Sequence, residues 1–122
     1  MKGVKGKKEA KELCEEFMKN ICEEKYDEGF GVIEPYFPST EKVFTNLREQ
    51  IKQQMPMVKQ NFGKCLGPVL VKEEEIKDLF FRFSFVQKFQ VSIIRWVFIF
   101  YKPEKEWLLN LINYDEKKEE LF

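Results

Sequence analysis

The spacing of apolar residues changes from a helical period to a period of two near Cys65, and no other feature constrains the fold as strongly. Before that point apolar residues recur every three or four positions, as in Ala10, Leu13, Cys14, Phe17, Met18, Ile21 and Cys22. Beyond it they alternate with other residues, as in Leu79, Phe81, Phe83 and Phe85. The sequence therefore predicts one α+β domain over residues 1–122, with N-terminal helices packed on a bent antiparallel β-sheet and loose termini at 1–6 and 116–122.

Two further helices are predicted between the first helix and the sheet. The segment from Tyr26 to Phe37 has helical spacing but contains Pro35, which favours an early end. Ser39 or Thr40 is expected to cap a third helix, whose apolar face consists of Val43, Phe44, Leu47, Ile51, Val58 and Phe62. Pro56 is expected to kink or split this helix.

The strand register follows from two short turns. A two-residue turn at Gln90 and Val91 places Phe85 opposite Trp96, Phe83 opposite Phe98 and Phe81 opposite Phe100. A similar turn at Glu104 and Lys105 places Phe100 opposite Leu109 and Phe98 opposite Leu111. These pairs predict one wholly apolar inner face that comprises Leu79, Phe81, Phe83, Phe85, Trp96, Phe98, Phe100, Leu109 and Leu111.

The reverse face of the predicted sheet is too apolar to be left fully in water. Its central patch consists of Val97, Ile99, Tyr101, Leu108 and Ile112, with Arg95 beside it. Contiguous apolar patches of this kind mark interfaces between subunits. We therefore expect a homodimer through Arg95, Val97, Ile99, Tyr101 and Ile112.

Charge and length exclude several classes of protein. Lysine plus arginine number 21, as do aspartate plus glutamate, so the neutral chain offers no field to attract nucleic acid. No stretch approaches the ~20 apolar residues that a membrane span needs. We expect a cytoplasmic location if the chain is complete, and an exported or periplasmic one if a leader was removed.

The three cysteines do not indicate a disulfide framework. Cys14 and Cys22 fall on one predicted helix, ~12 Å apart along its axis, which is too far for a bridge. We expect buried thiols on a helix face. Because the chain lacks histidine and any CxxC pair, neither a metal site nor a cofactor is predicted.

Two segments resemble the nuclear transport factor 2-like, or cystatin-like, cone superfamily. They are EEKYDEGFGVIEPYF after the first helix and RWVFIFYKPEKEWLLNLINYD near the end, the latter similar to the closing hairpin of small bacterial members of unknown function. Gly31 and Pro35 depart from the usual uninterrupted second helix. The superfamily includes isomerases, dehydratases and plain binding domains, so the resemblance implies a fold and leaves activity open.

No catalytic residue is assigned from the sequence, because the usual near-neutral acid–base group, histidine, is absent. The residues expected at a pocket or at the cone rim are Tyr26, Tyr36, Phe81, Phe83, Trp96 and Phe98. The interpretation favoured by the sequence is a non-enzymatic binding or assembly module. Two alternatives remain: a lyase or isomerase that uses Asp27 or Glu34 with one of the tyrosines, and a carrier of a small hydrophobic ligand.

Overall fold

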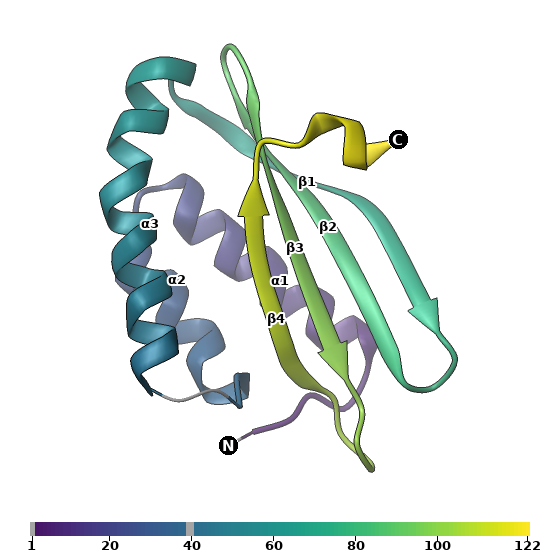
Figure 1. Cartoon of the computed structure of the whole chain (residues 1–122). Coiled ribbons are helices and arrows are strands. Elements are labelled where there is room, and N and C mark those ends of the chain that lie inside the picture. Colours follow the sequence, from purple (N-terminus) through teal and green to yellow (C-terminus); the bar gives the residue numbers. More distant parts are fainter. Residues whose placement is uncertain (1, 39–40) are drawn as a thin grey trace.

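The computed structural model describes residues 2–38 and 41–122, and it has helices followed by a four-stranded antiparallel sheet (Figure 1). The α+β class predicted from the sequence is confirmed. The elements are α1 (Lys7–Cys22), α2 (Tyr26–Ile33), a short 3₁₀ helix η1 (Glu34–Tyr36), α3 (Glu41–Phe62), β1 (Cys65–Ile76), β2 (Phe80–Phe89), β3 (Ile93–Tyr101), β4 (Leu108–Asp115) and a second 3₁₀ helix η2 (Lys118–Leu121).

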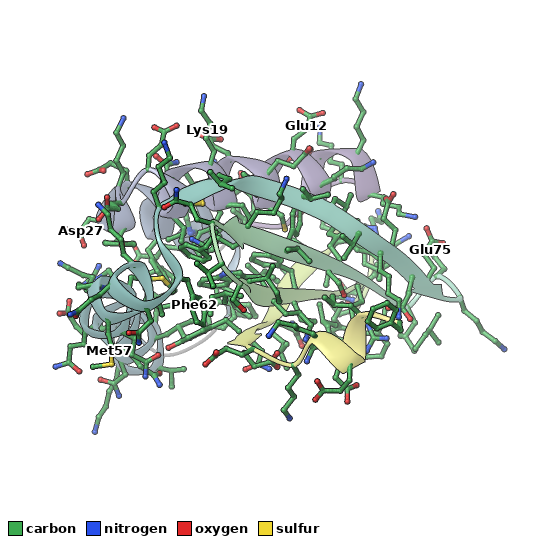
Figure 2. All side chains as sticks on the ribbon, turned by 90° about the horizontal axis from the view of Figure 1, so that it is seen from above. Glu12, Lys19, Asp27, Met57, Phe62 and Glu75 are labelled. Carbon is green, nitrogen blue, oxygen red and sulfur yellow. A yellow bond between two sulfur atoms is a disulfide. The ribbon has the colours of Figure 1, made fainter. Side chains whose placement is uncertain are left out.

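The strands follow one another across the sheet in the order β1-β2-β3-β4. Figure 2 shows α1 along one side of the sheet and η2 on the opposite side. Helix α3 runs beside β4, where the Tyr114 hydroxyl donates a hydrogen bond to the side chain of Gln54. The face toward α1 is called the inner face here, and the other is called the outer face.

The register predicted for β2 and β3 is confirmed: Phe85 pairs with Trp96, Phe83 with Phe98 and Phe81 with Phe100. The two-residue turn is also present, because the Phe89 amide donates to the Ser92 carbonyl over Gln90 and Val91. A tight turn leaves no freedom for these strands to slip, and a slip would turn every ring outward.

The predicted register of β4 is correct at Phe100 and Leu109 but wrong beyond them. Ile99 pairs with Leu111 while Phe100 pairs with Leu109, so Asn110 is an extra residue that forms a β-bulge. Phe98 consequently faces Ile112, and Leu111 turns to the outer face, where it is 39% exposed. The bulge also brings Tyr114 inward, where its ring stacks on Trp96 at 5.0 Å between centroids.

The core is a continuous aromatic layer between α1 and the inner face. Phe17 of α1 contacts Phe30, Trp96 and Phe98 edge-on, with centroids 5.1 to 5.6 Å apart. Edge-to-face rings at such distances add to the stabilisation from burial alone. Five other members of the predicted inner face are also buried; Leu79 is instead 42% exposed, because it lies in the β1–β2 turn before the ladder begins. The inner-face list was therefore wrong at Leu79 and Leu111.

Helix α3 is continuous across Pro56, so the expected split is absent. Pro56 lies on the exposed side of the helix, where water can satisfy the carbonyl that proline leaves without a donor. The buried side is formed by Phe44, Ile51 and Met55; Met55 was not in the predicted set, and Val43 is exposed. The expected caps at Ser39 or Thr40 lie outside the described residues.

The N-terminal segment is attached to the fold, although 1–6 was expected to be loose. Val4 is fully buried and forms a bridge with Trp107, with both backbone hydrogen bonds at 2.8 Å. The burial of one large apolar side chain contributes about 1.5–3 kcal/mol, which offsets part of the entropy cost of ordering this segment. At the other end, η2 turns back so that Glu119 and Glu120 lie near Arg95.

Candidate functional site

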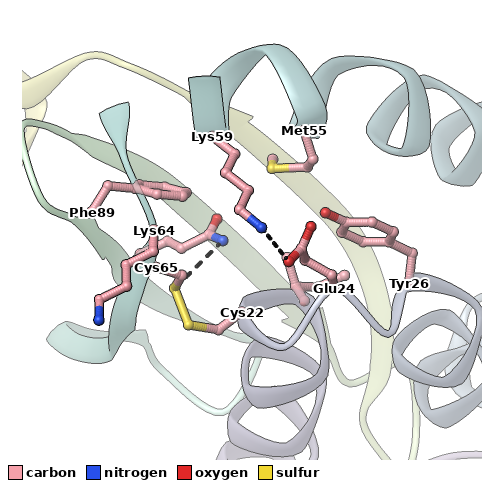
Figure 3. A pocket seen from close by; sticks show the side chains of 10 residues that line it. Cys22, Glu24, Tyr26, Met55, Lys59, Lys64, Cys65 and Phe89 are labelled. Carbon is pink, nitrogen blue, oxygen red and sulfur yellow. Dashed lines mark hydrogen bonds and ion pairs between the residues drawn. A yellow bond between two sulfur atoms is a disulfide. The ribbon is translucent and has the colours of Figure 1, made fainter. Parts of the chain in front are cut away.

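A cavity of about 230 Å³ opens where α1 and α3 end and β1 begins (Figure 3). Its apolar wall is formed by Ile21, Met55 and Phe89. Glu24, Tyr26 and Lys59 stand on one side, and Gln87 reaches it from β2. The rest of the space between α1 and the sheet is occupied by the aromatic core.

One wall of the cavity is a disulfide bond between Cys22 and Cys65, which corrects the expectation of free thiols. The objection to a Cys14–Cys22 bridge was sound, but the partner of Cys22 lies 43 residues later, with its Cα 5.5 Å away. Only the packing of α1 against the start of β1 creates this proximity. Cys14 is a free, buried thiol whose pKa is raised well above its usual value, chiefly by burial. It is therefore unreactive.

A left-handed turn at the end of α1 places Glu24 at the cavity. The Lys25 amide donates to the Asn20 carbonyl at 2.8 Å and the Glu24 amide to that of Ile21 at 3.1 Å, which is a Schellman motif. The motif gives Glu24 a φ of 63°, a conformation that costs a non-glycine residue about 1–2 kcal/mol. The Glu24 carboxylate then meets the Lys59 ammonium at 2.9 Å.

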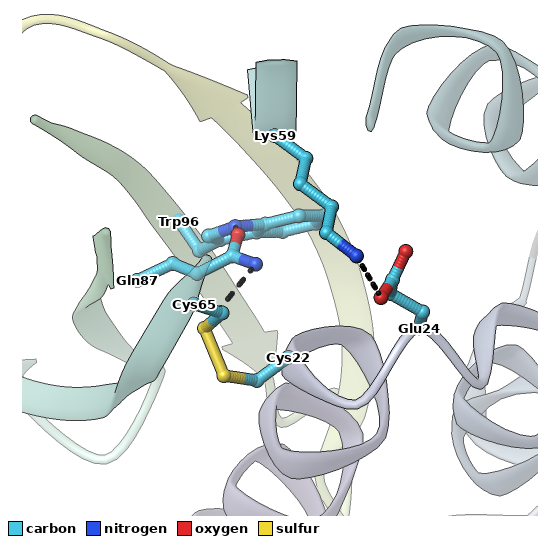
Figure 4. Close-up of a disulfide and its surroundings, with 6 residues drawn as sticks. All are labelled: Cys22, Glu24, Lys59, Cys65, Gln87 and Trp96. Carbon is cyan, nitrogen blue, oxygen red and sulfur yellow. Dashed lines mark hydrogen bonds and ion pairs between the residues drawn. A yellow bond between two sulfur atoms is a disulfide. The ribbon is translucent and has the colours of Figure 1, made fainter. Parts of the chain in front are cut away.

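Gln87 is the most unusual residue of the cavity, because it is polar and only 1% exposed. Its Oε1 accepts a hydrogen bond from Trp96 Nε1 at 2.9 Å, so the acceptor half of the amide is used. Its Nε2 contacts only the Cys65 sulfur, at 3.9 Å, among the described residues (Figure 4). Sulfur is a weak acceptor, so the two N–H groups of this buried amide make only one weak hydrogen bond at the cavity.

Apart from Glu24, whose carboxylate accepts a hydrogen bond from Lys59, the other polar side chains of the cavity are also donors. Lys59 has three N–H bonds and uses one on Glu24. Tyr26 is half-buried, and its pKa is raised by burial and by the nearby charge of Glu24, so its hydroxyl stays protonated. Lys64 adds a second cation at the edge, although Figure 3 shows its ammonium pointing away from Lys59. The cavity is therefore complementary to hydrogen-bond acceptors.

The arrangement supports binding better than proton transfer. Asp27, one acid considered for catalysis, is 60% exposed and pairs with Lys52 outside the cavity. Glu34, the other, is exposed beside Pro35. The carboxylate that does reach the cavity, Glu24, is neutralised by Lys59. Within 2–38 and 41–122, no three acidic, cysteine or histidine side chains gather as a metal site would require.

Only one of the predicted pocket residues lines this cavity. Tyr26 does so, whereas Tyr36 lies elsewhere, with Lys2 5.7 Å above its ring. The others are fully packed core residues, namely Phe81, Phe83, Trp96 and Phe98. Gln87 was missed, yet it has a sequence signal: it continues the inner-face alternation Phe81, Phe83, Phe85, and is the first polar residue in it.

The structure places the residues expected at a dimer face in different environments. Arg95 forms a two-pronged ion pair with Asp115 of the same chain, at 2.9 and 2.7 Å. Val97 is 8% exposed, and the bulge turns Ile112 to the inner face. Ile99 and Tyr101 remain half-buried on the outer face.

Comparisons with protein-family models, with curated proteins and with solved structures found no match to this chain. The resemblance to the nuclear transport factor 2-like fold therefore stays a prediction. In the part of the chain that the structure describes, no helix is long and apolar enough to cross a membrane.

Proposed function

We propose that this protein is a binding module that holds a small amphipathic carboxylate in the cavity beside the disulfide. The observation that carries the proposal is Gln87, a buried amide whose donor faces the cavity with only a sulfur atom as partner. A buried amide donor gains less from a weak sulfur acceptor than from an oxygen, and a ligand acceptor would supply the stronger hydrogen bond.

The charge of the cavity favours an anion over a neutral ligand. Lys59 pairs with Glu24, so the excess positive charge of the lining is that of Lys64 at the edge, whose ammonium points away from Lys59, and a monoanion would balance the set (Figure 3). A carboxylate accepts hydrogen bonds at both oxygens, which suits the donors of Gln87, Lys59 and Tyr26. Hydrogen bonds to a charged acceptor are roughly twice as strong as neutral ones.

The size and lining of the cavity favour a short apolar tail. Its volume of about 230 Å³ lies below the ~300–1,000 Å³ of pockets for drug-sized ligands. Ile21, Met55 and Phe89 offer the tail apolar contacts. We infer a ligand of about ten non-hydrogen atoms, for which ligand efficiency predicts affinity in the micromolar to millimolar range.

The test compares hexanoate with its neutral isostere hexanamide by ligand-detected NMR and calorimetry at pH 7. We expect hexanoate to bind about tenfold more tightly, because the amide lacks the charge that Lys59 recognises. Lys59→Met should abolish this difference. Lys52→Met is the matched control, because it removes a lysine of the same helix that pairs with Asp27 outside the cavity.

Three outcomes bear on the proposal. Selective binding of hexanoate that depends on Lys59 supports it. Equal binding of both probes would replace it with the carrier of small hydrophobic ligands. No binding of either probe at millimolar concentration, with folded protein, contradicts it.

A further inference from the structure

The outer face carries a second depression, at the end of the sheet away from the disulfide. This outer hollow, of about 370 Å³, is lined on that face by Glu74 and Ile76 of β1, Phe80 and Arg82 of β2, and Ile99 of β3. Glu75 and Phe81 also line the hollow, and Figure 2 places Glu75 near the tip of β1, on the side of the molecule opposite α3.

Apolar side chains surround the outer hollow on all four strands. Ile76 is 62% exposed and Leu111, which pairs with Ile99, is 39% exposed. The Phe80 ring contacts Tyr101 at 5.3 Å, which extends the apolar surface onto β3. An exposed set of this kind, contiguous across a sheet face, is typical of a protein interface.

The edges of the sheet are poor places for association. Strand β1 has irregularities at Cys65/Gly67 and at Leu70/Lys72 and contains Pro68, which offers no backbone N–H. Strand β4 is interrupted by its own bulge. Bulges, proline and charged residues on edge strands oppose the addition of another strand. The face is therefore the more favourable surface for association.

We propose that a second copy of this chain docks on the outer hollow, in a two-fold symmetric dimer. Among the described residues, three charged side chains line the hollow: Arg82 and Glu74 are joined by two hydrogen bonds of 2.8 Å, and Glu75 pairs with Lys7 at 3.0 Å, which leaves Arg82 and Glu74 as the cation and the anion of the surface. A surface with one cation and one anion beside an apolar centre is complementary to itself, because two-fold rotation can set the arginine of one copy against the glutamate of the other.

The net charge of the chain also permits a second copy to dock on the outer hollow. The chain has equal numbers of acidic and basic residues, so two copies do not repel each other at long range. Arg82 and Glu74 remain about half exposed in one chain, at 48% and 41%. They therefore have hydrogen-bonding positions left for a partner. The proposed face retains Ile99 and Tyr101 from the sequence prediction and replaces Val97 and Ile112 with Ile76, Phe80 and Leu111.

The test is the mass of the full chain in solution, by sedimentation equilibrium from low to high micromolar concentration. We expect twice the chain mass, with a dissociation constant that rises about tenfold in Ile76→Lys and in Leu111→Lys. Both positions are exposed, so the fold tolerates lysine. Val91→Lys is the matched control, because Val91 is 77% exposed but lies in the β2–β3 turn, outside the hollow.

Each outcome decides the proposal. Weaker dimers in the two hollow variants and an unchanged dimer in Val91→Lys support it. A wild-type protein that stays monomeric at every concentration overturns it, as does a dimer that ignores both hollow substitutions. Melting temperatures of all variants, measured alongside, separate loss of docking from loss of folding.

Discussion

Removal of the Cys22–Cys65 disulfide should cost this protein a large part of its stability. The bond joins the end of α1 to the first residue of β1 over a sequence separation of 43. In the chain-entropy model a closed loop of that length gives the unfolded chain about 13 cal/mol/K less entropy, or about 4 kcal/mol at 25 °C. The free energy of unfolding of a typical domain is only about 5–15 kcal/mol in total.

The effect on thermal unfolding follows from the length of the chain. At about 2.1 cal/mol/K per residue, the unfolding entropy of 122 residues is about 0.26 kcal/mol/K. A loss of 4 kcal/mol therefore lowers the melting temperature by about 15 °C. We expect the Cys22→Ala, Cys65→Ala double variant to melt that far below the oxidised wild type.

The assay is calorimetry of three samples: oxidised wild type, wild type with a small dithiol reductant, and the double variant. The reduced wild type should melt close to the double variant, because both lack the same cross-link, and the double variant should not respond to reductant. Thiol titration of denatured, unreduced wild type should count one thiol per chain, that of Cys14. Three thiols, or a double variant that melts with the oxidised wild type, would refute the reasoning.

Three further predictions concern single side chains. Lys77→Gly should raise the free energy of unfolding by about 1 kcal/mol in urea titrations, because Lys77 adopts a φ of 51° in the β1–β2 turn. Lys105→Gly, in the β3–β4 loop, is the control and should not raise it, because Lys105 does not have a positive φ. Gln87→Leu should lower it by about 1–3 kcal/mol, since it leaves the buried Trp96 Nε1 without an acceptor. Asp115→Asn should cost about 1 kcal/mol at pH 7. The hydrogen bonds from Arg95 chiefly lower the pKa of Asp115 in the folded protein, so this stabilisation is present above the ordinary aspartate pKa and is lost as pH falls through the lowered value. The stability difference between wild type and Asp115→Asn should therefore vanish in strong acid, and a constant difference would contradict the ion pair.

The sequence alone was sufficient where structure is local. The stripe from Ala10 to Ile21 predicts the buried side of α1, because a helix repeats every 3.6 residues. The pairing of Phe85 with Trp96 follows from a two-residue turn and the two-residue repeat of a strand. The aromatic inner face was predictable for the same reason.

The bulge at Asn110 shows where local reasoning fails. Leu109 and Leu111 continue a perfect alternation, so nothing in the pattern marks the extra residue. Tertiary packing decides it: the bulge brings Ile112 and Tyr114 against the aromatic core and releases Leu111. One residue thus moved a predicted core leucine onto the proposed interface.

The sequence by itself determined the order of helices and strands and the aromatic face that they enclose, because these depend on repeats within single segments. Only the tertiary structure decided the cavity. Its disulfide joins residues that lie far apart in the chain. The Lys59 ammonium of α3 likewise pairs with the carboxylate of Glu24, which follows α1. Gln87 becomes a potential ligand donor only because its oxygen accepts from Trp96 while its nitrogen, which donates to the Cys65 sulfur, lines the cavity. Such groups come together through packing between elements. Contacts between residues far apart in the chain produce no periodic pattern in the sequence.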